Sequence, residues 1–349
     1  MSASTEQILE PDSVIRTDRV NATTRSSRFV WSIYAAGMAL LALLLLGVQR
    51  DAYWLNILIL TLLFAGLATS WNIIGGFGGQ LSLGHGVFFA IGAYTVGITY
   101  TRYGWSPWAS MLVAIPIAMV VAAATSWPTF RLRGPFFAMA TLALNQVALV
   151  LATYFAGVTG GVQGITLPFR PSLRDLAFVE RWKYACLMLA FVALAGAVAT
   201  LVSRSRLGFA LRAVREDDEA AAAVGFNVFA VKMKGMLISA GLTSIGGSLF
   251  AVFVRYIDPS SVLNLTEVSV RIVLIALLGG IGTLLGPIVG AFLFIPAITV
   301  LQGQLASAPP GLNLVAVGAL LVLIPLALRR GIVGTTAAMF RAQRGRWSK

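Results

Sequence analysis

Long apolar runs separated by short polar segments dominate the sequence. Ten of these runs are about as long as a membrane-spanning helix or somewhat shorter. They are residues 30–48, 53–74, 83–101, 106–128, 135–157, 184–202, 235–254, 269–281, 285–303 and 311–328. The pattern predicts an all-α, polytopic helical membrane protein with about ten transmembrane helices, of which some are short.

Two of the apolar stretches are interrupted by glycine. Residues 71–95 hold seven glycines, and a glycine inside a helix costs about 1 kcal/mol relative to alanine. Two explanations stay open. The backbone breaks at membrane depth, where it is buried in protein or lines a wet cavity, or the glycines let helices pack closely, as in the pair Gly75 and Gly79.

The second glycine-rich stretch is residues 271–291. Gly282, Gly286 and Gly290 recur every four residues, which leaves one helix face bare for a close neighbour. Pro287 marks the start of a new helix, because proline suits the first helical turn. One interrupted stretch in each half of the chain leads to the hypothesis of an inverted internal repeat.

Composition and charge support the membrane assignment. Of 349 residues, 58% are hydrophobic and 11% are charged, against about 25% charged residues in an average soluble domain. The net charge of +13 does not indicate a nucleic-acid partner, because the basic residues lie between apolar runs, where they orient helices in a bilayer. Most Lys and Arg fall on one side if residues 1–29 and 329–349 are cytoplasmic tails around a transmembrane domain, residues 30–328.

The longest charged interruption is residues 203–234, which contain the only run of acidic residues in the chain. Apolar positions predict a helix over 207–224. Gly225 predicts a left-handed helix end, and Asn227 predicts the cap of the next helix. Two ion pairs are expected at a spacing of four residues, Arg212 with Glu216 and Arg215 with Glu219. The segment is either a solvated loop or a docking element on the cytoplasmic side, and the spacing of its apolar side chains favours docking.

Few polar residues fall within the apolar runs or beside their glycine breaks. They are Asn72, Gln80, Ser82, His85, Asn145, Gln146 and Arg271. His85 is the only histidine, and a hydrogen-bonded structural role is favoured over a proton relay. Arg271 either snorkels from the outer end of a short span or faces an anionic group in a pathway.

Several classes of chemistry lack their residues in this sequence. There is no G-x-x-x-x-G-K-[ST] motif, so the chain cannot hydrolyse nucleotide by that route, and there is no polar catalytic cluster or metal-ligand cluster. No acidic residue falls within the ten predicted spans, and ion-driven carriers usually place ionisable residues at depth.

Five motifs in order resemble those of branched-chain amino acid ABC transporter permeases of the LivM type. They are GGQLSLGHGVFFAIGAYT (78–95), RLRGPFFAMATLA (131–143), TGGVQGITLP (159–168), RAVREDDEAAAAVGFNVFAVK (212–232) and LGGIGTLLGPIVGA (278–291). The resemblance covers roughly residues 53 to 328. It departs from the family pattern at three positions. Other members often carry an acidic residue in place of Gln146 and of Ala222, and Asp or Asn in place of Gln163.

The resemblance implies a multi-pass permease subunit in the bacterial inner membrane, with both termini cytoplasmic. The subunit would work with two ATP-binding subunits, a second related permease and an extracytoplasmic substrate-binding protein. ATP and Mg would bind to the partner subunits, and this chain would bind no cofactor and have no catalytic site. Two alternatives remain: a permease for urea or short-chain amides, and, in a different class, an ion-driven secondary carrier.

The resemblance also assigns residues to two roles. Docking on the ATP-binding subunits would fall to Arg212, Arg215, Glu216, Asp217, Ala220, Ala221 and Gly225. The translocation pathway would be formed around Gly79, Gln80, Ser82, His85, Asn145, Gln146 and Arg271.

Overall fold

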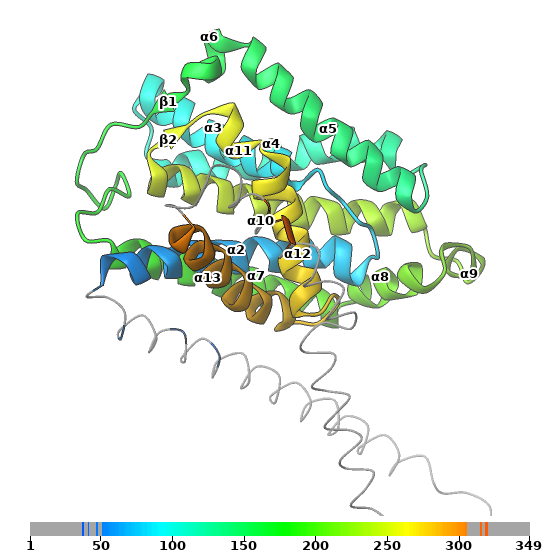
Figure 1. Cartoon of the computed structure of the whole chain (residues 1–349). Helices are drawn as coiled ribbons and strands as arrows, with labels where there is room; N and C mark the ends of the chain where they lie inside the picture. Colours follow the sequence, from blue (N-terminus) through cyan, green and yellow to red (C-terminus); the bar gives the residue numbers. More distant parts are fainter. Residues whose placement is uncertain are drawn as a thin grey trace, which may run out of the picture. The chain divides into compact units, whose positions relative to one another are not determined.

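The computed structural model describes residues 51–305 and a few isolated positions beyond them. Its helices are α2 (Ala52–Asn72), α3 (His85–Tyr103), α4 (Pro107–Thr129), α5 (Pro135–Tyr154), α6 (Ala156–Thr159), α7 (Trp182–Arg204), α8 (Arg206–Glu216), α9 (Asp218–Ala223), α10 (Val228–Val254), α11 (Pro259–Val262), α12 (Arg271–Gly279) and α13 (Gly286–Gln304) (Figure 1). Shorter elements are the π-helices η1 (Ile73–Phe77) and η3 (Leu265–Val270), the 3-10 helix η2 (Gly161–Gln163), and the strands β1 (Ile165–Thr166) and β2 (Tyr256–Ile257).

The described part of the chain is a polytopic helical membrane protein. Seven helical stretches within it are long and apolar enough to cross a membrane: Ala52–Phe77, Pro107–Thr129, Pro135–Tyr154, Trp182–Arg204, Val228–Val254, Pro259–Gly279 and Gly286–Gln304. Helix α3, with 19 residues, is not among these seven. The predicted count of ten is not confirmed, and the predicted spans 30–48 and 311–328 and both predicted tails lie outside the described residues.

Helix α2 is the centre of the packing. It contacts α7, α10, α12 and α13, and nearly all of its apolar window is buried. Helix α10 packs in turn on α3 and α4. Glycine allows α3 and α10 to touch backbone to backbone, because a Cβ atom added to Gly92 would lie 1.9 Å from the carbonyl oxygen of Ser244. A Cβ atom on Gly247 would lie equally close to the carbonyl oxygen of Phe89.

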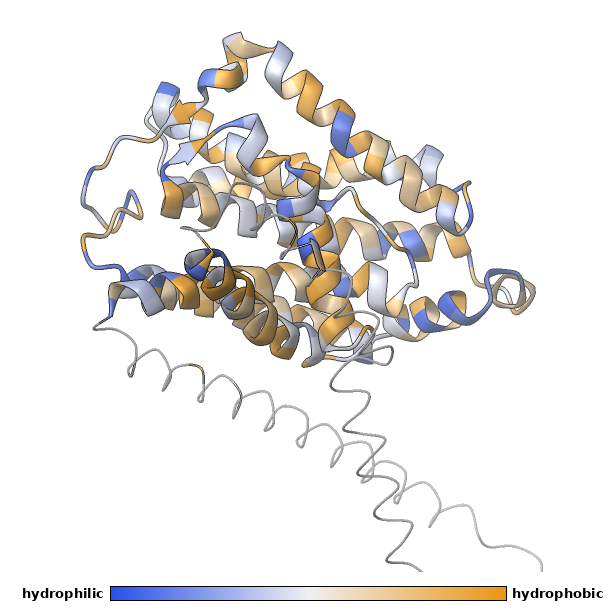
Figure 2. Ribbon diagram, in the orientation of Figure 1, coloured by the Kyte–Doolittle hydropathy of each residue, from blue (hydrophilic) through white to orange (hydrophobic). Residues whose placement is uncertain are grey.

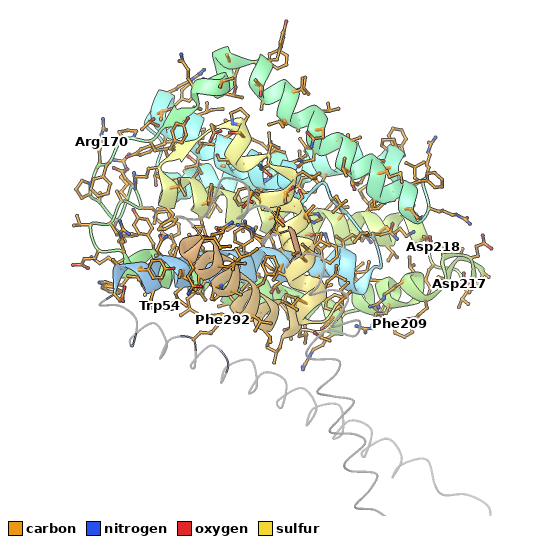
Figure 3. The ribbon with its side chains drawn as sticks, viewed as in Figure 1. Trp54, Arg170, Phe209, Asp217, Asp218 and Phe292 are labelled. Carbon is orange, nitrogen blue, oxygen red and sulfur yellow. The ribbon has the colours of Figure 1, made fainter. Side chains whose placement is uncertain are left out.

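Polar segments gather at two opposite ends of the helices (Figure 2). At one end, an ion pair between Arg133 and Glu219 joins the α4–α5 turn to α9, so residues 129–134 and 203–227 share this end. At the other end, Arg255 donates hydrogen bonds to the carbonyls of Pro168 and Leu176, and β1 pairs with β2. Figure 3 labels Asp217 and Asp218 at the first end, and Trp54 and Arg170 at the second.

Two predicted spans are too short. The predicted span 269–281 is longer, because α11, η3 and α12 continue it back to Pro259. The predicted span 235–254 belongs to a longer helix, because α10 begins at Val228, directly after the predicted cap Asn227, so Lys232 lies within the helix. The start of α13 at Gly286, with Pro287 in its first turn, confirms the prediction from proline.

Candidate functional site

Both glycine-rich stretches break the helix, and the second break lies against η1, the turn that precedes the first break. The first break is residues 78–84, between η1 and α3, and the second break is residues 280–285, between α12 and α13. The buried side-chain amide of Asn72, at the end of α2, binds the second break. Its Nδ2 donates to the carbonyl of Thr283 (2.8 Å), and its Oδ1 accepts from the N–H of Gly282 (2.9 Å).

Arg215 of α8 lies against a glycine of each break, Gly79 and Gly282. Its Nη1 donates a hydrogen bond to the carbonyl of Gly76 over 2.7 Å. A Cβ atom on Gly79 would lie 2.8 Å from Arg215 Cγ, and one on Gly282 would lie 2.6 Å from Arg215 Nη1. Both glycines also have positive φ, +68° and +77°. Glycine is therefore required twice here, for the backbone conformation and for the space that the arginine fills.

The helix pair α8–α9 with its flanking residues, 205–227, is called the elbow below. The sequence predicts one helix over 207–224, but Asp217 divides it with an extended backbone (φ −159°). The carboxylate of Asp217 instead caps α9 by accepting from the N–H groups of Glu219 and Ala220. These backbone hydrogen bonds hold the pKa of Asp217 below its usual value.

The end of the elbow follows the sequence prediction. Gly225 adopts a left-handed conformation (φ +97°), and the side chain of Asn227 accepts from the N–H of Ala230 to cap α10. These positions require a residue without a Cβ and a short side-chain acceptor, respectively. Both predictions are confirmed.

The ion pairs of the elbow differ from those expected. Arg215 does not pair with Glu219, because α8 ends before that residue and the guanidinium turns inward. Glu219 pairs with Arg133 instead, and this hydrogen bond, with the added attraction of the charges, raises the pKa of Arg133. Arg212 donates to the carbonyl of Ser203 rather than pairing with Glu216.

A further pair fixes α9 to α10. Asp218 binds Lys232, which is buried although it is a lysine. In the Arg133–Glu219 pair, by contrast, both side chains are exposed, so the pair contributes little to the free energy of unfolding. Among these contacts, Arg215 with Gly76 and Asp218 with Lys232 are therefore the ones that tie the elbow most firmly to the membrane helices.

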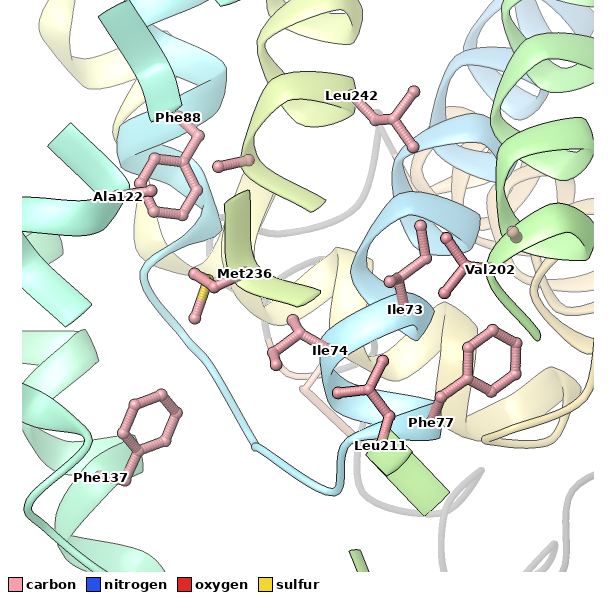
Figure 4. Packing of buried hydrophobic residues seen from close by; sticks show 12 residues of the cluster. Ile73, Ile74, Phe77, Phe88, Ala122, Phe137, Val202, Leu211, Met236 and Leu242 are labelled. Carbon is pink, nitrogen blue, oxygen red and sulfur yellow. The ribbon is translucent and has the colours of Figure 1, made fainter. Parts of the chain in front are cut away.

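The apolar side chains of the elbow divide between an inner and an outer surface. Leu211 and Val214 are among the apolar side chains whose spacing favoured docking, but both are fully buried. Leu211 belongs to a cluster with Ile74 and Phe77 (Figure 4). Phe209 and Val224 are exposed, Val224 to 81%. Of the alanines predicted to dock, Ala220 is exposed and Ala221 is buried.

His85 lies in the interior with both ring nitrogens hydrogen-bonded. Ser239 Oγ donates its one hydrogen bond to the carbonyl of Ser70, so it can only accept from His85. His85 Nε2 is therefore the donor in the bond to Ser239 Oγ (2.8 Å). His85 Nδ1 accepts a hydrogen bond from Ser82 Oγ (3.1 Å), and Ser82 Oγ in turn accepts one from the N–H of Gly84. A neutral imidazole satisfies this network completely, so His85 is the hydrogen-bonded residue that the sequence favours.

Asn145 and Gln146 are adjacent on α5 but face different surroundings. Asn145 is buried, donates to the carbonyl of Leu263 (2.8 Å) and accepts from Ser269. Ser269 Oγ in turn accepts from the N–H of Gly86 at the start of α3. Gln146 is exposed. The predicted pathway residues are therefore only partly brought together.

A cavity of about 260 Å³ lies among α3, α4, α5 and α10. It is lined mostly by apolar side chains, together with the hydroxyl residues Ser82, Thr125, Ser126, Thr129 and Thr141. Of the predicted pathway residues only Ser82 borders it. Gln80 donates to the carbonyl of Gly78 within the first break, and Gly79 is exposed there.

Arg271 is deeper than predicted and has a partner that the sequence analysis missed. Because its span begins at Pro259, Arg271 lies near the middle, where it pairs with Glu267 and packs over Phe64. The prediction that no acidic residue lies within a span is therefore wrong. The spacing of four residues between Glu267 and Arg271 could have indicated the pair. Among residues 51–305 there is no cluster of ligands for a metal ion.

Comparison with known proteins adds independent information. The family described as branched-chain amino acid transport system / permease component matches residues 53–325. LivM, a high-affinity branched-chain amino acid transport permease of Escherichia coli (strain K12), is 29% identical over 83% of this chain and 72% of LivM. LivH of the same strain is 24% identical over 78% of this chain and 91% of LivH. A tyrosine transport system permease protein of Clostridioides difficile (strain R20291) is 29% identical over 31% of this chain and 38% of its own length. No solved structure matches the chain.

Proposed function

The chain belongs to the family of permease components of branched-chain amino acid transport systems, and from this premise we propose that it is the membrane-spanning subunit of an ATP-driven importer for branched-chain amino acids. The family match over most of the chain carries this proposal, together with the names of LivM and LivH. The membrane is the bacterial inner membrane, with the elbow and both termini on the cytoplasmic side. The distribution of Lys and Arg supports this orientation.

Two ATP-binding subunits dock on the elbow and carry ATP and Mg, while this chain binds no cofactor and has no ATPase site. The exposed Phe209 and Val224, with Glu216, Ala220 and Gly225, supply the outer surface for this contact. Movement of the elbow reaches the two helix breaks through Arg215, which binds the end of η1. In this assignment Arg215 transmits force inward instead of touching the ATP-binding subunit.

A second, related permease covers the exposed face of α5. Gln146 is the twelfth of 20 residues in α5, and its amide is exposed at the depth where a bilayer is driest. A polar side chain without a partner is costly in hydrocarbon, so this face suits a protein interface or a wet pathway better than lipid. Substrate delivered by an extracytoplasmic binding protein passes along this face.

The experiment that tests this function is uptake. Cells that lack their own branched-chain amino acid importers would express the chain with its ATP-binding, permease and binding-protein partners. We expect ATP-dependent uptake of radiolabelled leucine, isoleucine and valine. Uptake of urea or acetamide in their place would contradict the substrate, and uptake of tyrosine alone would narrow it to an aromatic amino acid. Transport by the purified chain alone, driven by an ion gradient, would contradict the mechanism.

A further inference from the structure

The ion pair between Glu267 and Arg271 lies at the middle of the membrane-spanning region. Glu267 is the ninth residue of the 21-residue stretch Pro259–Gly279, which places it near the middle of the stretch. Arg271 lies over the ring of Phe64, with 5.3 Å between the guanidinium carbon and the ring centroid. Phe64 is the thirteenth of 26 residues in Ala52–Phe77. Two neighbouring helices therefore give the same depth, inside a hydrocarbon core about 30 Å thick.

The two charged side chains differ in how far they open to the surface. The side chain of Arg271 is 17% exposed and that of Glu267 is 47% exposed. The guanidinium is thus set back against Phe64 on α2, and the carboxylate stands in front of it. Thr266, next to Glu267, is also exposed. An open carboxylate and a hydroxyl are costly against lipid, so this surface faces a polar path or a partner protein.

The backbone around the pair is irregular and is held from α5. Residues Leu265–Val270 form a π-helix, a geometry often found at functional sites. The side chain of Asn264 caps it by accepting from the N–H of Glu267 (3.0 Å). Asn145 of α5 holds the segment on both sides, through Leu263 and Ser269. The helix that carries the exposed Gln146 therefore also fixes the segment that carries the exposed Glu267.

We propose that the Glu267–Arg271 pair is a binding site for the zwitterionic backbone of an amino acid during its passage. The carboxylate of the substrate binds the guanidinium of Arg271, and its ammonium group binds the carboxylate of Glu267. This inference rests on the proposed function and adds the chemical group that the pathway recognises.

Charge balance is the physical reason for this assignment. A zwitterion brings one charge of each sign, so it replaces one ion pair with two and leaves no charge unmatched at depth. The planar guanidinium suits a carboxylate because it can donate two parallel hydrogen bonds. Urea or an acetamide carries no charge to exchange for the existing pair. An anion or a cation alone would leave one protein charge without a partner.

The test separates recognition from simple charge neutralisation. The variants are Glu267→Gln, Arg271→Met and the double variant, assayed for leucine uptake with the complete transporter. We expect each single variant to lose about 10- to 100-fold in kcat/KM, the value of a charge-assisted hydrogen bond, and the double variant to stay as low. If the pair only neutralises itself, the double variant regains wild-type uptake, and that result overturns the proposal.

Further measurements keep the result interpretable. Arg271→Lys retains the charge and the pair but loses the planar fork, so we expect about tenfold lower kcat/KM at an unchanged level of protein in the membrane. Wild-type uptake by this variant also overturns the proposal. The matched control is Glu180→Gln/Lys183→Met, which removes an exposed ion pair at the start of α7 and should leave uptake unchanged. The wild-type arm tests the proposed function by itself, because leucine uptake by the wild type is required before any variant is compared.

Discussion

Replacement of Arg215 by methionine tests whether the elbow acts on the helix breaks. The change removes the hydrogen bond from Arg215 Nη1 to the carbonyl of Gly76 and keeps most of the side-chain volume beside Gly79 and Gly282. A hydrogen bond that involves a charged group contributes about 1.5–3 kcal/mol. Because Arg215 as a whole is exposed, we take the lower end, which corresponds to about a tenfold change in an equilibrium.

The assay compares uptake with ATP hydrolysis in proteoliposomes that contain the complete transporter. Arg215→Met should reduce the amount of leucine imported per ATP hydrolysed about tenfold, because the ATP-binding subunits still dock but their movement no longer reaches η1. The matched control is Arg206→Met, which removes an exposed cation from the first residue of the same helix. Equal coupling of uptake and hydrolysis in Arg215→Met and wild type would refute the role of this contact.

Three further predictions concern packing, charge and turn geometry. Gly92→Ala places a Cβ atom 1.9 Å from the carbonyl oxygen of Ser244, so we expect the free energy of unfolding, measured by thermal unfolding, to fall by about 1–3 kcal/mol. The control Gly157→Ala, whose Cβ atom meets no atom within 4 Å, should leave this free energy unchanged. The pKa of Asp217 is lower in the folded than in the unfolded protein. The cap therefore stabilises α9 at pH values above the unfolded pKa, and this stabilisation is lost as the pH falls through the folded pKa. Asp217→Ala should therefore make the elbow more sensitive to proteolysis than the wild type at neutral pH. A difference between variant and wild type that persists unchanged in acid would contradict the cap. Gly225→Pro cannot adopt φ +97°, so uptake should stop while the protein remains in the membrane, and normal uptake would count against elbow docking.

Local rules predicted much of the fold. The density of glycine in residues 71–95 indicated the first break, and Pro287 indicated the start of α13. Gly225 and Asn227 indicated the end of the elbow and the cap of α10. Each of these depends on the backbone preference of one residue and its near neighbours, which a single sequence contains.

Contacts between distant segments could not be read in the same way. Periodicity placed Leu211 on an apolar face, but it cannot distinguish a face that binds a partner from one that packs on η1. The spacing of Arg215 and Glu219 suits an ion pair only if one helix continues through Asp217, and the competing cap at Asp217 ends it. Glu267 was missed because the hydropathy of the polar π-helical turn put the start of the span at residue 269, ten residues beyond Pro259.

Helix α12 connects the two features on which the transport mechanism depends. It begins at Arg271, in the ion pair at mid-membrane, and ends at Gly279, just before the second break. A Cβ atom on Gly279 would lie 1.7 Å from the carbonyl oxygen of Gly286, so α12 and the start of α13 touch at backbone level and move together. Nine helical residues span about 13 Å, and such a short, buried helix transmits a displacement as a rigid body. A shift of Arg215 against the second break would therefore move Arg271 relative to Phe64. Phe64 belongs to α2, the helix that leads through η1 into the first break.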